Sequence, residues 1–438
     1  MGELSRRASG ALLLTAVTLL TLAAPVRGFA GFGAMHADST YGVQMTFSVD
    51  LPGGAPDRLD LLLDFEGSDA TLVTPVTASG SSATYRVDTA ADSVTPNTRI
   101  TYRWRATNGG QVSLSPQGTL LYDDDRPGLN WHTARIGDAT VHWYGSSEAE
   151  ARRFGQLTAN AASAAETLLS DKLAGPIDIF VYVSRTDFFG ALGPGAREWT
   201  GAATFPQLRT IFMWLGGGST AYLETTITHE VTHVVFHDAT DNPFHGPATW
   251  FNEGLATWAE RQSADVQQAT VAAAAKSTGL LAFDAITDQF PIGAEAAGLS
   301  YAEGATMVQL IIDRYGRAAV ASIAAAWRGG ASDAEALQAG TGITAEQLYA
   351  SYFASFGVGP PQPVSPAPIP GSNVDKPPQP PAASEPAAAT SATPAASAAP
   401  GPAQTAEAPI GLYVGGLVVL VVLLGGLWWR ARGRAPAS

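Results

Sequence analysis

The sequence of 438 residues contains no cysteine, and basic residues are few, with 25 Lys and Arg against 39 Asp and Glu. Without cysteine the chain has no disulfide, no thiolate zinc ligand and no cysteine nucleophile. The formal net charge of −14 argues against a nucleic-acid partner, which would call for a basic face. This acidity selects no substrate, because solubility explains it equally well. With 46% hydrophobic residues the chain can still bury a large core.

A short apolar run lies near the start of the sequence. Arg6 and Arg7 precede an uncharged stretch at 11–24, which is too short to span a bilayer comfortably. Small residues follow it, with Gly28 and Ala30 as a candidate cleavage pair. This pattern predicts a secretory signal peptide over residues 1–30, in preference to a buried helix.

A second uncharged run, at 410–429, is long enough to cross the hydrocarbon core. It ends in two tryptophans and is followed by a basic tail at 430–438. The positive-inside rule would keep that tail in the cytoplasm. The sequence therefore predicts a single-pass protein of the cell membrane, attached by its C-terminal helix, with the N-terminal part extracellular.

Two segments between these ends have different compositions. Residues 359–409 are rich in Pro, Ala and Ser and predict an extended linker. Residues 31–125 alternate apolar and polar side chains, for example over Gln44–Val49 and Arg99–Ala106, between glycine-rich turns. Short strands at this spacing predict an antiparallel β-sandwich of immunoglobulin or fibronectin type. Nothing in this sandwich looks catalytic, so a structural or binding role is the default.

The pattern changes over residues 139–358. Strand-like runs at Thr140–Tyr144, Ile177–Val183 and Thr210–Leu215 flank a long helical segment, Glu148–Leu173, and helical segments then predominate. Mixed strands followed by helices predict an α+β domain.

Within this domain, the run HEVTH at 229–233 places two histidines one helical turn apart. Residues at this spacing share a helix face, so both imidazoles can reach one ion. Zinc accepts nitrogen and oxygen ligands, and Glu230 can take a proton from a zinc-activated water. The alternative is a pair of ordinary core or surface histidines beside an exposed glutamate.

A second run, WFNEGLA at 250–256, predicts another helix after a turn. The two runs together resemble the gluzincin metallopeptidases, which include thermolysin-like and aminopeptidase-like enzymes. In that group an HExxH helix gives two zinc ligands and a following helix containing Asn-Glu gives the third. The resemblance extends over roughly 140–357 and implies a zincin-like domain of small mixed sheet plus helices. It implies Zn²⁺ held by His229, His233 and Glu253, with Glu230 as the general base.

The resemblance also suggests supporting groups around the site. Gluzincins often use a downstream Tyr or His as oxyanion donor, and Tyr301 resembles that tyrosine in position, although it can equally be a tyrosine packed at a helix start. Thr257 and Glu260 are candidates to orient a histidine ligand, or are ordinary surface residues. Tyr315, near a helix end, is expected to be structural.

Two further histidines flank the loop between the motif helices. His237 could replace a ligand but is favoured as a helix-end histidine, because Glu253 already fills the third position. His245 is a weaker candidate to line the cleft.

The predicted activity is hydrolysis of a peptide or protein substrate. Aminopeptidases of the group carry a glycine-x-methionine-glutamate-asparagine segment whose Glu binds the substrate amine, and the nearest run here, GAATF at 201–205, lacks that acid. This favours an endopeptidase, and the segment can still form an edge strand that pairs with an extended peptide. The alternatives are a catalytically inactive zinc-binding surface or adhesion module and a non-peptide zinc hydrolase. A purely structural zinc is disfavoured, because two His and one Glu leave a ligand position open.

Overall fold

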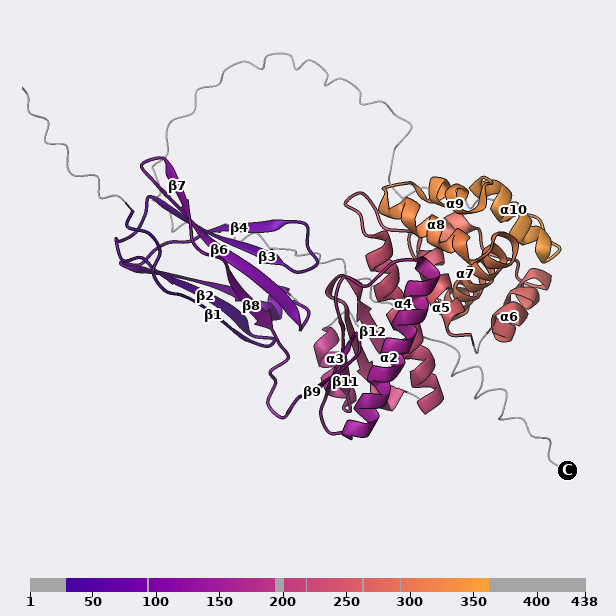
Figure 1. Cartoon of the computed structure of the whole chain (residues 1–438), viewed down its shortest axis with the longest axis horizontal. Coiled ribbons are helices and arrows are strands. Elements are labelled where there is room, and N and C mark those ends of the chain that lie inside the picture. The colour runs from indigo at the N-terminus through magenta and orange to yellow at the C-terminus, as the bar shows by residue number, and fades with distance from the viewer. Residues whose placement is uncertain are drawn as a thin grey trace, which may run out of the picture.

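The computed structural model describes residues 29–92, 94–193, 201–217, 219–261, 264–291 and 293–361. In Figure 1 the first, strand-rich part lies on the left and the helix-rich remainder on the right. The strands and helices fit the predicted α+β class. The predicted domain boundaries stay a prediction.

The first part consists of two antiparallel sheets that share one hydrophobic core. One sheet has the order β1 (Met35–Thr40), β2 (Gln44–Asp50), β5 (Ser82–Asp88). The other has the order β4 (Thr71–Pro75), β3 (Arg58–Phe65), β6 (Thr98–Asn108), β7 (Gln111–Leu114), with β8 (Gly118–Tyr122) also paired to β6 and the short helix α1 (Thr89–Asp92) after β5. Alternate side chains of each strand point inward, so Phe47 and Trp104 from different sheets are fully buried together.

The second part begins with a mixed five-stranded sheet. Its order is β12 (Ala202–Phe205), β13 (Thr210–Trp214), β11 (Ile177–Tyr182), β10 (Ala139–Trp143), β9 (His132–Ile136). The three central strands are parallel to one another, and both outer strands run antiparallel to their neighbours.

The two faces of this sheet belong to different cores. Ile179 and Ile211 lie in the larger core, which includes the apolar residues of the helices α2 (Glu148–Leu169) and α4 (Thr220–Thr240). Phe180 and Phe212, one position along, lie in a smaller aromatic core with the helix α3 (Arg185–Leu192). The period of two along each strand thus assigns α2 and α4 to one face and α3 to the other.

The remaining helices pack beyond α4 (Figure 1). They are α5 (Thr249–Ala259), α6 (Ala264–Lys276), α7 (Ala294–Tyr315), α8 (Arg317–Arg328), α9 (Asp333–Thr341) and α10 (Ala345–Ser355), with short 3₁₀ turns η1 (Pro206–Leu208), η2 (Leu215–Gly217) and η3 (Phe283–Ile286). Helices α5 and α7 cross in backbone contact at two glycines. A Cβ on Gly254 would lie 2.4 Å from the carbonyl carbon of Gly304, so only glycine allows this approach.

An ion pair in the segment between β8 and β9 helps to join the two parts. Asp124 is 3% exposed and accepts hydrogen bonds from the Arg126 guanidinium and, at 3.0 Å, from the Tyr182 hydroxyl on β11. Tyr41 on the sandwich side donates its hydroxyl to the backbone oxygen of Gly190 in α3 at 2.7 Å. These bonds attach the sandwich to the sheet that supports α4.

The structure contradicts the predicted membrane-spanning helix. Within the part of the chain that it describes, no helix combines the length and the apolar character needed to cross a bilayer. The long helices α2, α4 and α7 each carry charged and polar residues along their length. The C-terminal transmembrane helix and the single-pass localisation with an extracellular N-terminal part are therefore corrected, and the membrane partner gains no support. The run at 410–429 lies outside the described residues, as do the tail at 430–438, most of the linker at 359–409 and residues 1–28 of the signal peptide.

Candidate metal centre

Helix α4 carries the HEVTH run. The Ser219 side chain caps the helix by accepting the backbone N–H of Tyr222, and the buried Ile227, Val231 and Val234 form the stripe that packs into the core. This packing fixes the rotation of the helix about its axis, and with it the direction in which the two histidines of the run point.

Helix α5 returns beside α4 and brings in the third candidate ligand. Trp250, Phe251 and Leu255 on α5 are fully buried, and Glu253 is 4% exposed. The helix crossing at Gly254 adjoins Glu253 directly. The packing of α5 against α4 and α7 therefore holds the Glu253 carboxylate at the level of the HEVTH run.

The three predicted ligands come together. Nε2 of His229 and Nε2 of His233 each lie 3.6 Å from Oε2 of Glu253, and the candidate ligand atoms of the group all lie within 4.8 Å of one another. Two ligands about 2.1 Å from a tetrahedral zinc ion would be separated by about 3.4 Å, which agrees with these spacings.

The three converging atoms have no hydrogen-bond partner among the described residues. Their side chains are at most 5% exposed. Buried polar atoms in folded proteins are nearly always paired, so three that remain unpaired and face one another fit a bound cation. The described residues thus contain a buried His-His-Glu group that could bind a metal ion.

Each histidine is oriented from its other ring nitrogen. Nδ1 of His229 lies 2.8 Å from Oε1 of Glu260, and Nδ1 of His233 lies 2.8 Å from Oδ1 of Asn252. Both partners are oxygen acceptors, so each Nδ1 donates its hydrogen and each Nε2 keeps its lone pair for a metal.

The local charges also favour a cation. Burial lowers the pKa of His229, but the neighbouring carboxylates of Glu253 and Glu260 outweigh it and raise that pKa to about 10. Burial lowers the pKa of His233 to about 4, since the nearby Glu253 only partly offsets it. The carboxylates that hold a proton on His229 would equally stabilise a metal ion between the two rings.

Glu230 lies between the histidines in sequence and is fully buried. Its Oε2 accepts a hydrogen bond of 2.5 Å from Thr204 Oγ1 on β12, whereas Oε1 has no partner among the described residues. Burial raises the pKa of Glu230 to about 7. A carboxylate with a pKa near neutrality is suited to accept and return a proton.

Of the other predicted residues, some lie beside the metal group and others do not contact it. The ring of Tyr301, on α7, lies 6.3 Å from the ring of His229, centre to centre, so this residue borders the group. Glu260 contacts His229, whereas the Thr257 hydroxyl is buried without a hydrogen-bond partner among the described residues. The side chain of His245 is exposed, and its Nδ1 lies 3.1 Å from the backbone oxygen of Gly246 in the same loop.

Two further predicted positions lie apart from the metal group. His237 is partly exposed toward the end of α4, and Tyr315 ends α7 and packs against the core, in keeping with the structural role expected of it.

Sequence reasoning missed two contacts. Asn252 immediately precedes Glu253, and its position one residue before a ligand is a signal that could have suggested a role beside His233. Thr204 lies far from the HEVTH run in sequence, and only the pairing of β12 with β13 brings it to Glu230.

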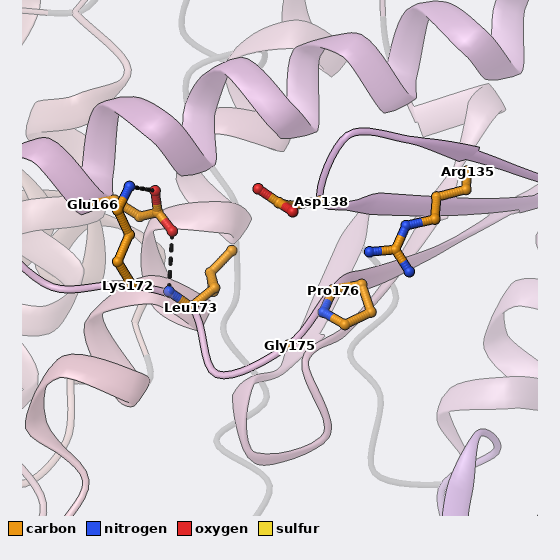
Figure 2. A pocket seen from close by; sticks show the side chains of 7 residues that line it. All are labelled: Arg135, Asp138, Glu166, Lys172, Leu173, Gly175 and Pro176. Atoms are coloured by element: carbon orange, nitrogen blue, oxygen red, sulfur yellow. Dashed lines mark hydrogen bonds and ion pairs between the residues drawn. The ribbon is translucent and has the colours of Figure 1, made fainter.

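A separate pocket of about 260 Å³ lies away from the metal group (Figure 2). It is formed by the turn between β9 and β10 and by the connection from α2 to β11. Within it Glu166 pairs with Lys172 at 2.6 Å and accepts the backbone N–H of Leu173 at 3.0 Å. Arg135 and Asp138 line the same pocket, so acidic and basic side chains balance and no ligand charge is selected.

Comparison with known proteins bears on the helical part of the chain. Residues 159–356 match the model of the Peptidase MA superfamily. Curated proteins give no match. Among solved structures, Legionella pneumophila aminopeptidase A in complex with aspartic acid is 11% identical with a TM-score of 0.37, over 74% of this chain and 49% of that chain. A Br derivative of BhCBM56 is 11% identical with a TM-score of 0.17, over 20% of this chain and 88% of that chain.

Both TM-scores are too low to carry an argument about fold or function. The family model, by contrast, spans both motif helices and every residue of the metal group. It therefore confirms the resemblance drawn from the two motifs: residues 159–356 resemble the gluzincin-type metallopeptidases of the Peptidase MA superfamily.

Proposed function

We propose that the chain is a zinc-dependent metallopeptidase that cleaves peptide bonds within a chain, with His229, His233 and Glu253 as zinc ligands and Glu230 as general base. The observation that carries this proposal is the convergence of three buried, unpaired ligand atoms beside a buried carboxylate.

The donor set supports zinc over other metals. Two imidazole nitrogens and one carboxylate oxygen form the ligand set of many catalytic zinc sites, which keep the fourth position open. When bound, zinc polarises a carbonyl group and acidifies a water molecule. An all-oxygen set would instead suit calcium or magnesium.

The residues of the chain supply the remaining chemistry. Glu230 takes a proton from the attacking water while the oxygen of that water bonds to the scissile carbonyl carbon. The same carboxyl group then returns the proton to the leaving amine nitrogen as the C–N bond breaks. Tyr301, whose ring borders that of His229, is the proposed donor of a hydroxyl hydrogen to the carbonyl oxygen, which gains negative charge in the transition state.

The edge of the mixed sheet supports an endopeptidase. Strand β12 ends the strand order, and an extended peptide could pair with its outer edge. The segment 201–205 contains no acidic side chain that could pair with the charged amine of a free substrate N-terminus. We therefore expect peptides with a blocked N-terminus to be cleaved as readily as free ones.

The test is digestion of a mixed peptide library, half of it N-acetylated, by the purified protein. The wild type should cleave internal bonds, and Glu230→Gln should retain zinc but cleave about 100- to 10,000-fold more slowly. Glu224→Gln is the matched control, because this residue lies on the same helix but pairs with Arg153. It should cleave like the wild type.

Other outcomes identify the alternatives. Zinc with no hydrolytic activity would favour the inactive binding module, and zinc-dependent cleavage of esters or amides but not peptides would favour another hydrolase. Cleavage by Glu230→Gln at the wild-type rate would overturn the assigned mechanism.

A further inference from the structure

Thr204 is a fully buried hydroxyl residue on the edge strand β12. Its Oγ1 donates to Glu230 Oε2 at 2.5 Å, a contact between residues that are 26 positions apart in sequence. The bond links strand β12 to helix α4 at the residue proposed as general base.

The register of the sheet fixes the direction of this hydroxyl. Thr204 pairs with Ile211 on β13, and cross-strand partners lie on the same face. Ile211 belongs to the core that α4 helps to form, whereas Phe205 and Phe212 belong to the aromatic core on the opposite face. Position 204 therefore faces α4, and a shift of register by one residue would turn it away.

The bond gives the two carboxylate oxygens of Glu230 different environments. Oε2 is held by Thr204, and Oε1 is buried with no partner among the described residues. The terminal torsion of a glutamate is broad, so an unheld carboxylate would sample many orientations. With Oε2 fixed, the carboxylate plane is fixed, and Oε1 is the oxygen left to accept a proton.

We propose that Thr204 is a positioning residue for the general base, which holds Glu230 in the orientation required for proton transfer. This inference rests on the proposed peptidase function. Thr204 itself touches neither a metal ligand nor the reacting atoms in this account, so its loss should reduce turnover without removing the metal.

Two variants distinguish the contribution of the Thr204 hydroxyl from that of the branched shape of its side chain. Thr204→Val keeps the branched shape and removes the donor, and Thr204→Ser keeps the donor. The control is Thr210→Val on the neighbouring strand, where an equally buried hydroxyl bonds Leu208 O and Asn97. Thr204→Ala replaces Thr204→Val if the latter does not fold.

The kinetic readout is the split between kcat and KM on a peptide from the library. Thr204→Val should lower kcat about 10- to 100-fold at unchanged KM and zinc content, because it removes a hydrogen bond to a charged group. Thr204→Ser should restore most of the rate, and Thr210→Val should keep the wild-type kcat. A wild-type kcat in Thr204→Val, or no rescue by serine, would overturn the inference.

A crystal structure of Thr204→Val gives a readout that needs no activity. The Glu230 carboxylate should leave its wild-type orientation or occupy more than one. If it stays in place, the positioning role fails, whatever the kinetics show. If the wild type cleaves no peptide, the proposed function fails, and the orientation of Glu230 in the variant still decides the role of Thr204.

Discussion

Buried carboxylates are treated differently in the two parts of the molecule. In the sandwich, Asp60 is 1% exposed, and its two oxygens accept hydrogen bonds from Arg58 and Arg105, each at 2.9 Å. Burial raises the pKa of Asp60, but the two guanidinium groups outweigh it and leave the pKa below its ordinary value. In the helical part, Glu253 is nearly as buried, yet among the described residues its Oε2 is paired with no lysine or arginine and faces the imidazole nitrogens of His229 and His233.

The difference shows how a functional site can be recognised. Burying an ion costs free energy unless a partner of opposite charge accompanies it. In the sandwich, two arginines of the same chain supply the positive charge beside the buried Asp60, as expected of a structural region. Among the described residues the metal group offers Glu253 no lysine or arginine, only the imidazoles of His229 and His233, so a proton on His229 or a bound cation supplies the positive charge.

The largest expected effects come from neutralising one carboxylate of each kind. Glu253→Gln should abolish stoichiometric zinc binding and lower peptide cleavage by more than about 100-fold, because it removes a ligand and not merely a supporting group. Asp60→Asn should keep zinc and lose roughly 1–3 kcal/mol of unfolding free energy, because the buried position loses the charge that accepts hydrogen bonds from Arg58 and Arg105, whose own side chains are partly exposed. Metal analysis and urea unfolding measure the two properties. Full zinc content in Glu253→Gln would contradict the ligand assignment.

A smaller effect on zinc binding is expected from Glu260, which contacts a metal ligand and is not a ligand itself. Glu260→Gln should weaken zinc binding about 10- to 100-fold, because the carboxylate that orients His229 through Nδ1 becomes a neutral amide. Competition with a chelator measures the affinity. Thr257→Val is the control, since its hydroxyl has no hydrogen-bond partner among the described residues, and it should bind zinc like the wild type. Equal affinities in all three proteins would remove Glu260 from the site.

The smallest effect concerns a buried carboxylate that neither arginines nor the metal group explain. Glu303 on α7 is fully buried, accepts the backbone N–H of Leu281 through Oε1, and has no partner for Oε2 among the described residues. Burial raises the pKa of Glu303 to about 8 from the ordinary 4.5. Because the folded pKa is the higher one, its contribution to stability is complete below pH 4.5 and is lost as the pH rises through 8.

Glu303→Gln cannot ionise and can still accept the Leu281 N–H. Its unfolding free energy should match that of the wild type near the ordinary pKa of a glutamate and exceed it by roughly 1–3 kcal/mol at pH 9. Urea unfolding as a function of pH measures the difference. A constant difference across this range would show that Glu303 keeps one protonation state throughout.

The local patterns in the sequence predict the elements well. Alternation over Gln44–Val49 predicts a strand, and β2 covers Gln44–Asp50. The spacing of the two histidines predicts a shared helix face, and both lie on α4. Such patterns depend on neighbours one turn or one strand step away, and those are visible in the sequence.

Contacts set by distant parts of the chain could not be predicted. Whether Thr257 or Glu260 reaches His229 depends on where α5 ends, and Glu260 is the last, capping residue of that helix. The contact of Thr204 with Glu230 depends on the register of β12. The predicted membrane helix is corrected on a separate ground: within the described residues no helix is long and apolar enough to span a bilayer, and the run at 410–429 itself lies outside them.

The central claim is that the unpaired buried atoms of the metal group hold a zinc ion. The most direct measurement is the metal content of the purified protein by mass spectrometry, with His233→Ala prepared in the same way. About one zinc ion per chain in the wild type, lost in the variant, is the result predicted here. No stoichiometric metal in the wild type, or the same zinc content in His233→Ala, would contradict the account.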